Sequence, residues 1–560
     1  IFLVDRLTGR RRPDNKYQFG LQAALEAKEG LGITPDTDIL GQISVRGLML
    51  KYSHLSGITG TARDSEIEFQ QAYGLETVSV SPTYKNRRVD LPTMIFDSKI
   101  DKLNEIVMQT QQCQKIGIPV LIGTITVEQS EELGTLFTEN NINYKRLDAV
   151  NNDKEAEIVK TAGSYGSVTL ATNMAGRGTD ILMDPDLNKR IASNYAAMAV
   201  EHLSKGAGSI IFHYRSTEEA RTLESELSKI KDIKWIRENT GENLQTIVTK
   251  GNSPKPSKTC KNIDCRFGLY VIGSELNESR RVDLQLRGRT ARQGNLGSAR
   301  FIISYEDHLL AFSNSRKPHS IKKRGIHLRH DEGTLLQDWI KNIQSTIESE
   351  NVKSRNITHE FDFVIEKRDA FFNHLRKQTL ESHSFFEKCM TSVEQRSESL
   401  TKQYFHSPNI NEYPTLFDAF SEELEREFEI DVENLWGLGI PKMQDSLITL
   451  LSHKLNKLRD YIGPKEFDTV SKQIFIKTVD DLRINHNSLI RDVLLSIQLC
   501  GYGQKKTVTE FIGHVITAEK QLENEIVEAF LPRIFRIQPK TPCRQIFEPT
   551  ILKDIHEILV

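Results

Sequence analysis

The sequence predicts an α/β domain built on a doubly wound parallel sheet, followed by a mostly α-helical region. Between residues 83 and 312, short apolar runs alternate with helical segments, which is the order found in doubly wound sheets. From residue 334 to 407 the chain contains neither Gly nor Pro and repeats apolar residues at helical spacing. These two observations divide the chain into an α/β part and a helical part.

The elements of the α/β part can be placed along the chain. Helices are expected at 97–112 and 128–140, and strands at 119–123, 144–147 and 167–171. The run at 119–123 is short and apolar, as is typical of strands buried on both faces of a parallel sheet.

Bulk properties exclude several classes of protein. A chain of 560 residues corresponds to about three to four domains. The net charge of −2 gives no global field that would recruit nucleic acid or an anionic membrane. Six scattered cysteines are too few for a disulfide scaffold, so a reducing cytoplasm is expected. No apolar run approaches the roughly 20 residues that a membrane span needs.

One motif places two arginines on a short helical segment. Gln285, Gly288, Arg289 and Arg292 form the pattern Q-x-x-G-R-x-x-R. Residues three apart lie on one side of a helix, so both guanidinium groups can reach one anion. The planar, permanently charged guanidinium suits phosphate oxygens better than an ammonium does.

A second motif directly follows the predicted strand 167–171. It reads TNMAGRGTD at 172–180 and contains Gly176, Arg177, Gly178, Thr179 and Asp180. Its glycines let the backbone approach a ligand closely, and its carboxylate can accept from a hydroxyl or orient the neighbouring arginine of the same turn. Open parallel sheets bind ligands at the carboxyl ends of their strands. Together the motifs predict the nucleotide-sensing edge of the second RecA-like half of an ATP-driven motor.

The combination of motifs resembles the SecA family, the ATPases that drive preproteins through the bacterial Sec channel. The matching runs are VDRLTGRR (4–11), LQAALEAKEG (21–30), LSGITGTA (55–62), KEAEIV (154–159), TNMAGRGTDI (172–181), ESRRVDLQLRGR (278–289) and ARQGNLGSARF (291–301). Helicase-like ATPases in general share the arginine spacing, whereas its combination with EAKEG and ITGTA is specific. The helical remainder of the chain resembles the family less closely.

The resemblance implies five parts of the chain. These are the end of a first nucleotide-binding domain (1–82), a second RecA-like nucleotide-binding domain (83–312) with an insertion (182–267), a long scaffold helix region (313–407), a helical wing (408–466), and a two-helix finger with a C-terminal helical segment (467–560). As one helix, 334–407 would be about 110 Å long, so a bend or break is expected.

The resemblance also implies ATP and Mg²⁺ as cofactors and assigns roles to the motif residues. Arg289 and Arg292 are expected to be catalytic, as arginine fingers that stabilise charge on the γ-phosphoryl group. The expected cofactor-binding residues are Gly176, Arg177, Gly178, Thr179, Asp180, Arg281, Gln285 and Gly288. For each arginine, the alternative is a structural ion pair.

A complete ATP site is not expected from these residues alone. The sequence has no G-x-x-x-x-G-K followed by Ser or Thr, which is the usual phosphate cradle. It opens on Ile1 with an apolar run rather than on Met, which favours a fragment whose P-loop half and metal ligands lie upstream. No metal ligand is therefore expected within the chain.

The insertion at 182–267 carries its own elements. A strand is expected at 209–213 and a charged helix at 217–231, and the Gly-, Asn-, Ser-, Pro- and Lys-rich stretch 240–258 is expected to be a surface loop. Cys260 and Cys265 are expected to be free thiols, because a zinc site needs two further ligands and none is nearby.

One departure from the family concerns the finger. Asp492 stands where bacterial members of the family usually carry an aromatic residue at the tip that pushes polypeptide. A carboxylate cannot grip varied side chains as a large apolar ring can. The handling of substrate by this chain is therefore open.

Three functions follow from these patterns. The first is a SecA-like motor subunit on the cytoplasmic side of the inner membrane, peripherally bound, whose partners are the Sec channel membrane proteins and unfolded preproteins. This function leaves open a homodimer and contact with an anionic membrane surface. The second is a non-hydrolysing SecA-derived binding protein or adaptor, in keeping with the missing P-loop and Asp492. The third is a superfamily 2 nucleic-acid helicase, but no nucleic acid is expected, because the near-neutral charge argues against a basic groove.

Overall fold

The computed structural model describes most of the chain and divides it into two compact units. The described residues are 1–4, 11–12, 15–17, 20–35, 41–147, 155–172, 179–240, 243–250, 260–312, 330–405, 414–500 and 507–537. The first unit comprises Ile1–Thr34 and Ser56–Lys353, and the second comprises Pro35–Leu55 and Ser354–Val560.

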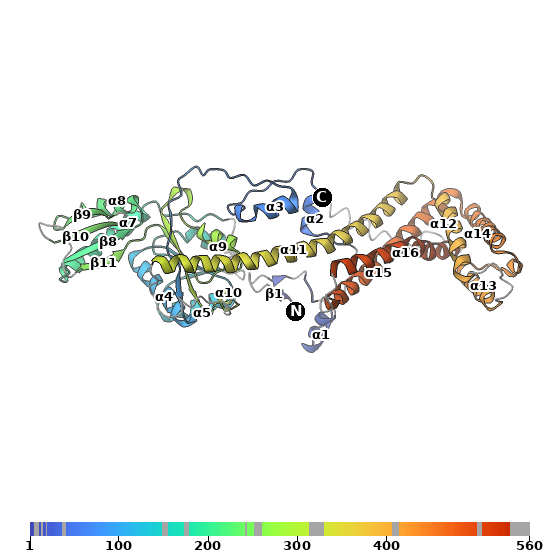
Figure 1. Cartoon of the computed structure of the whole chain (residues 1–560), viewed down its shortest axis with the longest axis horizontal. Helices are drawn as coiled ribbons and strands as arrows, with labels where there is room; N and C mark the ends of the chain where they lie inside the picture. Colours follow the sequence, from blue (N-terminus) through green and yellow to red (C-terminus); the bar gives the residue numbers. More distant parts are fainter. Residues whose placement is uncertain are drawn as a thin grey trace. The chain divides into compact units, whose positions relative to one another are not determined.

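The first unit is built on a parallel sheet of seven strands (Figure 1). Its order is β3-β13-β12-β5-β7-β6, with β4 beside β13, and every neighbouring pair is parallel. The strands are β3 (Arg88–Asp90), β4 (Met94–Phe96), β5 (Val120–Thr124), β6 (Lys145–Leu147), β7 (Val168–Thr172), β12 (Leu269–Gly273) and β13 (Gly297–Ser304). All residues of β5, β7 and β12 are buried, so the predicted doubly wound parallel sheet is confirmed.

Helices cover both faces of this sheet. They are α4 (Lys99–Ile116), α5 (Val127–Glu139), α6 (Glu155–Thr161), α9 (Arg280–Arg287), α10 (His308–Phe312) and the first part of α11 (His330–Glu381). Ile122 of β5 packs in one core with Ile106 of α4, whereas Leu121 packs in another with Leu286 of α9 and Leu336 of α11. Successive side chains of a strand point to opposite faces, so one strand contributes to both cores.

The unit also contains short elements outside the sheet. These are β1 (Leu3–Val4), β2 (Arg11–Arg12), α1 (Leu21–Lys28) and α3 (Glu66–Tyr73). Strands β1 and β2 pair antiparallel.

The insertion forms a second, smaller sheet with its own helices, which extends to one side of the large sheet in Figure 1. Its order is β11-β8-β10-β9, built from β8 (Ser209–Tyr214), β9 (Lys234–Thr240), β10 (Asn243–Thr249) and β11 (Cys260–Asp264), with α7 (Leu187–Ser204) and α8 (Thr217–Leu227). The predicted strand at 209–213 is present, and the helix predicted at 217–231 is present but ends at Leu227.

The prediction of a surface loop at 240–258 is wrong for β10. This strand lies inside the small sheet, between β8 and β9, and its Ile247 and Val248 are fully buried. The surrounding Asn, Thr and Gly residues dominated the composition and hid a short apolar core. Residues 241–242 and 251–259 lie outside the described part.

The chain after α9 makes an unusual turn. The backbone is left-handed at Ala291 (φ 56°), Gln293 (φ 53°) and Gly294 (φ 76°). Thr290 Oγ1 donates to the carbonyl oxygen of Leu269, at 2.6 Å, and so anchors the turn to the first residue of β12. Only glycine adopts this conformation freely, so Arg292 lies between two residues whose backbone is strained.

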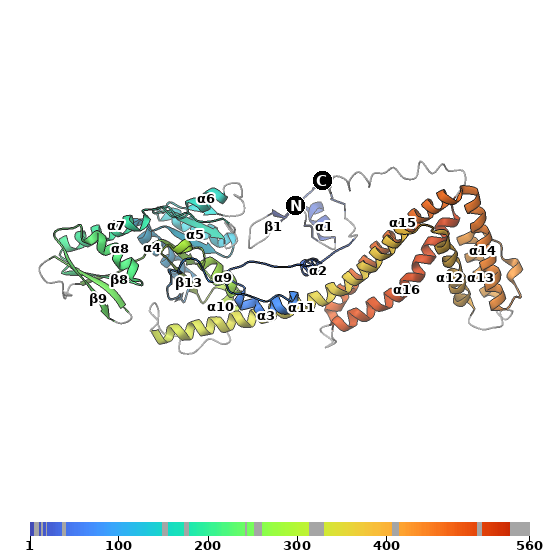
Figure 2. The same ribbon diagram turned by 90° about the horizontal axis from the view of Figure 1, so that it is seen from above.

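The second unit is helical. Its helices are α2 (Val45–Leu50), the later part of α11, α12 (Phe386–Tyr404), α13 (Pro414–Phe428), α14 (Ile440–Ile462), α15 (Pro464–Cys500) and α16 (Thr507–Phe535). Helices α15 and α16 run side by side in opposite directions (Figures 1 and 2). The predicted break in the long helix is confirmed, since α11 ends at Glu381 and α12 begins at Phe386. Asp492 is exposed on α15, and residues 501–506 lie outside the described part of the chain.

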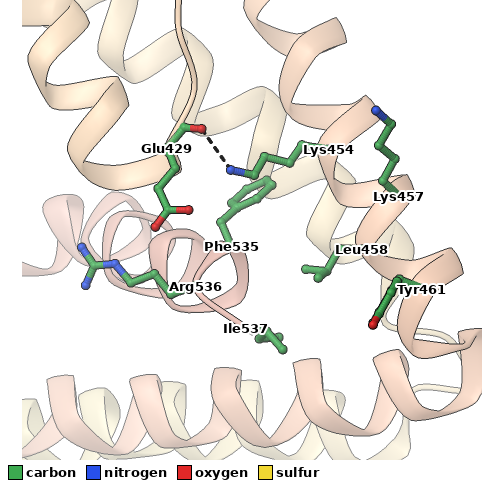
Figure 3. A pocket seen from close by; sticks show the side chains of 8 residues that line it. All are labelled: Glu429, Lys454, Lys457, Leu458, Tyr461, Phe535, Arg536 and Ile537. Carbon is green, nitrogen blue, oxygen red and sulfur yellow. Dashed lines mark hydrogen bonds between the residues drawn. The ribbon is translucent and has the colours of Figure 1, made fainter. Parts of the chain in front are cut away.

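A lysine side chain caps the carboxyl end of α13. Lys454 of α14 donates through Nζ to the carbonyl oxygen of Phe428 and, at 3.2 Å, to that of Glu429 (Figure 3). Glu429 has a left-handed backbone (φ 51°), the conformation in which many helices end. Because the last carbonyls of a helix lack partners within it, Lys454 satisfies acceptors that would otherwise be unpaired. Burial lowers the pKa of Lys454.

One buried cation joins three helices of the second unit. Arg396 of α12 has a side chain only 3% exposed, and it donates to Glu423 (3.0 Å) and Glu427 (2.9 Å) of α13 and to Glu528 (2.6 Å) of α16. Burial raises the pKa of Glu427. A buried charge is tolerated when it is paired and hydrogen-bonded in this way.

Replacing Ala291 by glycine is expected to stabilise the protein by about 0.5–1 kcal/mol, because glycine adopts the left-handed conformation without strain. Thermal unfolding of Ala291→Gly measures the effect. The matched control, Ala197→Gly in the middle of α7, should instead destabilise by about 1 kcal/mol. Destabilisation by both changes would contradict the left-handed turn.

Removing the buried guanidinium of Arg396 is expected to lower the free energy of unfolding. Arg396→Met removes the cation that Glu423, Glu427 and Glu528 share and should destabilise the protein by about 3–5 kcal/mol in urea unfolding at pH 7. The loss should shrink at acidic pH, where the carboxylates become protonated. The control Lys402→Met removes an exposed ion pair with Glu398 on the same helix and should cost at most about 0.5 kcal/mol. Equal losses would show that the Arg396 cluster is not buried.

Candidate functional site

The two sequence motifs meet in an ion pair. Arg292 Nη1 donates to Asp180 Oδ1 at 2.9 Å, across 112 positions of sequence. Gln293 Nε2 donates to the other carboxylate oxygen at 2.8 Å, and Arg292 Nε donates to the carbonyl oxygen of Gly288 at 3.1 Å. The structure therefore brings together three predicted site residues, Asp180, Gly288 and Arg292.

The Arg292 side chain keeps donors for a further ligand. It is 35% exposed, and within the described part of the chain its Nη2 has no hydrogen-bond partner. A guanidinium held by a carboxylate on one edge and open on the other can donate to a phosphate oxygen in a fixed orientation. This arrangement can bind an anion and stabilise charge that develops on it.

Gln285 and Arg289 flank this pair. Gln285 Nε2 donates to Thr61 Oγ1 at 3.3 Å, which joins the arginine motif to the ITGTA run. Arg289 lines a small cavity of about 20 Å³ together with Gly123 and Thr172, the last residue of β7. This cavity is too small for a nucleotide, so a ligand would have to bind on the outer side of these residues.

Arg281 lines a different cavity from Arg289. That cavity has a volume of about 580 Å³ and is also lined by Arg63, Asp64, Arg280 and Lys341. Arg281 Nε is buried and has no hydrogen-bond partner among the described residues, while Arg280 and Asp64 approach to 3.9 Å. The structure thus does not join Arg281 to the Asp180–Arg292 pair.

The remaining predicted residues belong to the TNMAGRGTD motif, of which only Thr172, Thr179 and Asp180 are described. Gly176, Arg177 and Gly178 are outside the described residues, so their placement stays a prediction. Thr179 is partly buried next to Asp180.

Residues on either side of the pair contact the segments where strands begin. Thr290, two residues before Arg292, is anchored at the first residue of β12. Met183, three residues after Asp180, pairs with Gly163, which precedes β7. The connection from β12 to the start of the parallel strand β13 carries the arginines with it.

A buried carboxylate in the motif helix was missed by sequence reasoning. Asp283 is 4% exposed and accepts from Asn277 and from Gln344 of α11. Burial raises the pKa of Asp283 to about 6. The available signal was an acidic residue between two apolar ones, Val282 and Leu284, within the arginine motif.

A cavity of about 540 Å³ in the second unit is a weaker candidate. It is lined by Glu429, Lys454, Lys457, Leu458, Tyr461, Phe535, Arg536 and Ile537 (Figure 3). Lys454 Nζ already donates to the backbone carbonyl of Glu429 at the end of α13. The charged groups of Lys457 and Arg536 extend in different directions (Figure 3). Its cations do not converge on a common point.

No group of three or more His, Cys, Asp or Glu side chains in the described part of the chain could hold a metal ion. Over the same residues, no helix has both the length and the hydropathy required to cross a membrane.

Comparison with known families gives a consistent result along the chain. The family model described as SecA DEAD-like domain matches residues 6–70, SecA P-loop domain matches 85–328, and SecA Wing and Scaffold domain matches 332–538. Together these three models account for most of the sequence.

Curated relatives agree with the family models. A protein translocase subunit SecA of Vesicomyosocius okutanii is 31% identical over 91% of this chain, and one of Thermodesulfovibrio yellowstonii is 31% identical over 96%. Protein translocase subunit SecA 1 of Clostridioides difficile is 28% identical over 97%. The chain spans about half the length of these relatives, namely 51%, 56% and 60%. On this evidence, the chain belongs to the SecA family.

Proposed function

We propose that this chain supplies the second nucleotide-binding half and the helical region of a SecA-type motor, which couples ATP binding and hydrolysis to the export of preproteins through the Sec channel. The observation that carries the proposal is the Asp180–Arg292 pair, in which residues of two separated motifs orient a guanidinium whose Nη2 has no hydrogen-bond partner among the described residues. The names of the relatives, protein translocase subunits, support the same function.

In this proposal Arg292 and Arg289 act as arginine fingers toward the γ-phosphoryl group. Asp180 fixes the orientation of Arg292, and Gln285 connects the finger segment to Thr61. Fingers of this kind contribute about 10³ or more to the rate of phosphoryl transfer. The proposal also includes a nucleotide-binding role for five further residues, Gly176, Arg177, Gly178, Thr179 and Arg281.

The residues fit the phosphate end of ATP but not its metal ion. The arginines offer donors of the charge and geometry that phosphate requires. The sequence has no G-x-x-x-x-G-K followed by Ser or Thr, so the phosphate cradle would come from another segment of the motor. Asp180 is taken by Arg292 and Gln293, and no acidic cluster stands beside it among the described residues. No step is therefore assigned to Mg²⁺.

The proposed partners are the Sec channel membrane proteins and unfolded preproteins, met at the cytoplasmic face of the inner membrane. Pairing into a homodimer and contact with anionic lipid extend the same proposal.

A second candidate function is a non-hydrolysing adaptor that binds presecretory chains. The exposed Asp492 on α15 favours it, because a carboxylate at this position grips apolar side chains poorly. The two candidates differ in ATP turnover, which only the motor shows.

Replacing Arg292 tests the motor. In the full-length natural protein, Arg292→Lys should lower the kcat of ATP hydrolysis by about 10³, because an ammonium cannot hold Asp180 and a phosphate oxygen in the same geometry. Asp180→Asn should cost about 10² through misplacement of Arg292. The exposed control Arg221→Lys should change nothing. Wild-type turnover in Arg292→Lys would reduce the Asp180–Arg292 contact to a structural ion pair.

Placing an aromatic ring at position 492 distinguishes the proposed motor from the proposed adaptor. Asp492→Tyr should raise preprotein-stimulated ATP turnover by about two- to tenfold, because the ring adds apolar contact with the moving chain. Asp445→Tyr, at an exposed position of α14, serves as the control and should have no effect. Preprotein binding without ATP turnover in the full-length protein, unaltered by Asp492→Tyr, would instead support the adaptor.

A further inference from the structure

A buried polar contact connects the arginine-bearing segment with α11. Asp283, on the first turn of α9, accepts at Oδ1 from the backbone N (3.0 Å) and Nδ2 (2.8 Å) of Asn277. Its Oδ2 accepts from Gln344 Nε2 of α11 at 2.7 Å. Gln344 is 5% exposed and also donates to the carbonyl oxygen of Asn277 at 2.8 Å. One amide of α11 thus bonds both α9 and the segment before it.

Packing alone does not explain this contact. The neighbouring side chains in the same region, Leu286 of α9 and Leu336 and Ile340 of α11, form an apolar core that would accommodate apolar residues. Burying a carboxylate there costs free energy, which its hydrogen bonds have to offset. A polar link of this kind fixes one relative position of two helices, whereas apolar contacts allow them to slide.

The link lies at one end of a short, stiff element whose other end carries the candidate site. Helix α9 runs from Arg280 to Arg287 beside the first part of α11 (Figures 1 and 2). It continues into Gly288, whose carbonyl oxygen binds Arg292. A shift of the arginines would therefore act on α9, the helix that carries Asp283.

We propose that Asp283 is a positioning residue: its hydrogen bond to Gln344 ties the arginine segment to α11, so that engagement of phosphate by Arg289 and Arg292 is transmitted to this helix. The inference rests on the proposed nucleotide function of the same arginines. By linkage, the position of α11 in turn governs how well the arginines are aligned.

Kinetics of variants test the link in the full-length natural protein. Gln344→Leu should lower the kcat for ATP hydrolysis roughly tenfold and leave KM for ATP within about twofold, because alignment of the arginines acts on the transition state. Gln337→Leu makes the same change at an exposed position of α11 and should leave both constants unchanged. If Gln344→Leu fails to fold, Gln344→Asn, which is too short to reach Asp283, replaces it.

Hydrogen exchange tests the transmission directly. Addition of a non-hydrolysable ATP analogue should alter amide protection at both α9 and residues 336–352 of α11 in the wild type. In Gln344→Leu the change should persist at α9 and vanish in α11. A merely structural contact would lower the unfolding temperature and leave both responses in place.

A reversed pair provides the rescue. In Asp283→Asn with Gln344→Glu, the amide donates and the carboxylate accepts, so part of the lost kcat should return relative to either single variant. The inference is overturned if Gln344→Leu and Asp283→Asn fold and keep the wild-type kcat while Arg292→Lys loses it. If Arg292→Lys also keeps its activity, the proposed function fails, and the inference with it.

Discussion

The parallel pairing of β12 with β13 is the constraint on which the candidate site depends. Two neighbouring parallel strands oblige the chain between them to travel back along the sheet before the second strand can begin. Here the return consists of α9 and the left-handed turn around Arg292, and it ends beside Leu269. The arginines are held in place because the sheet fixes both ends of the segment that carries them.

The same constraint explains what the sequence could and could not predict. Alternating apolar runs and helical segments were enough for the parallel sheet, since strands such as β5 are apolar throughout. The sequence predicted that Asp180 could orient the neighbouring arginine of its own motif, whereas the structure pairs it with Arg292 of the other motif. This pairing was not predicted, because spacing along the chain does not show which separated segments meet.

Other contacts could not be predicted from the sequence, because the residues that form them are far apart along the chain. Gln344 looks like an ordinary polar position of a long helix, and only the fold brings it to Asp283. In the second unit, Arg396 resembles any charged helix residue until α12, α13 and α16 enclose it. Burial of a polar side chain depends on which elements pack around it, and periodicity within one helix does not contain this information.

The insertion has a consequence for how the chain folds during synthesis. Its helix α7 contributes Ile191 and Tyr195 to the core that also holds Ile106 and Ile122 of the large sheet. The sheet itself cannot be completed until β12 pairs with β5, and β12 begins at Leu269, after the whole insertion. On the ribosome, β5 and β7 therefore emerge well before the strand that closes the sheet on their other side. Until then the edge of β5 that pairs with β12 has no partner strand, and such an edge can pair with another chain, so this stretch depends on protection from aggregation while it is being made.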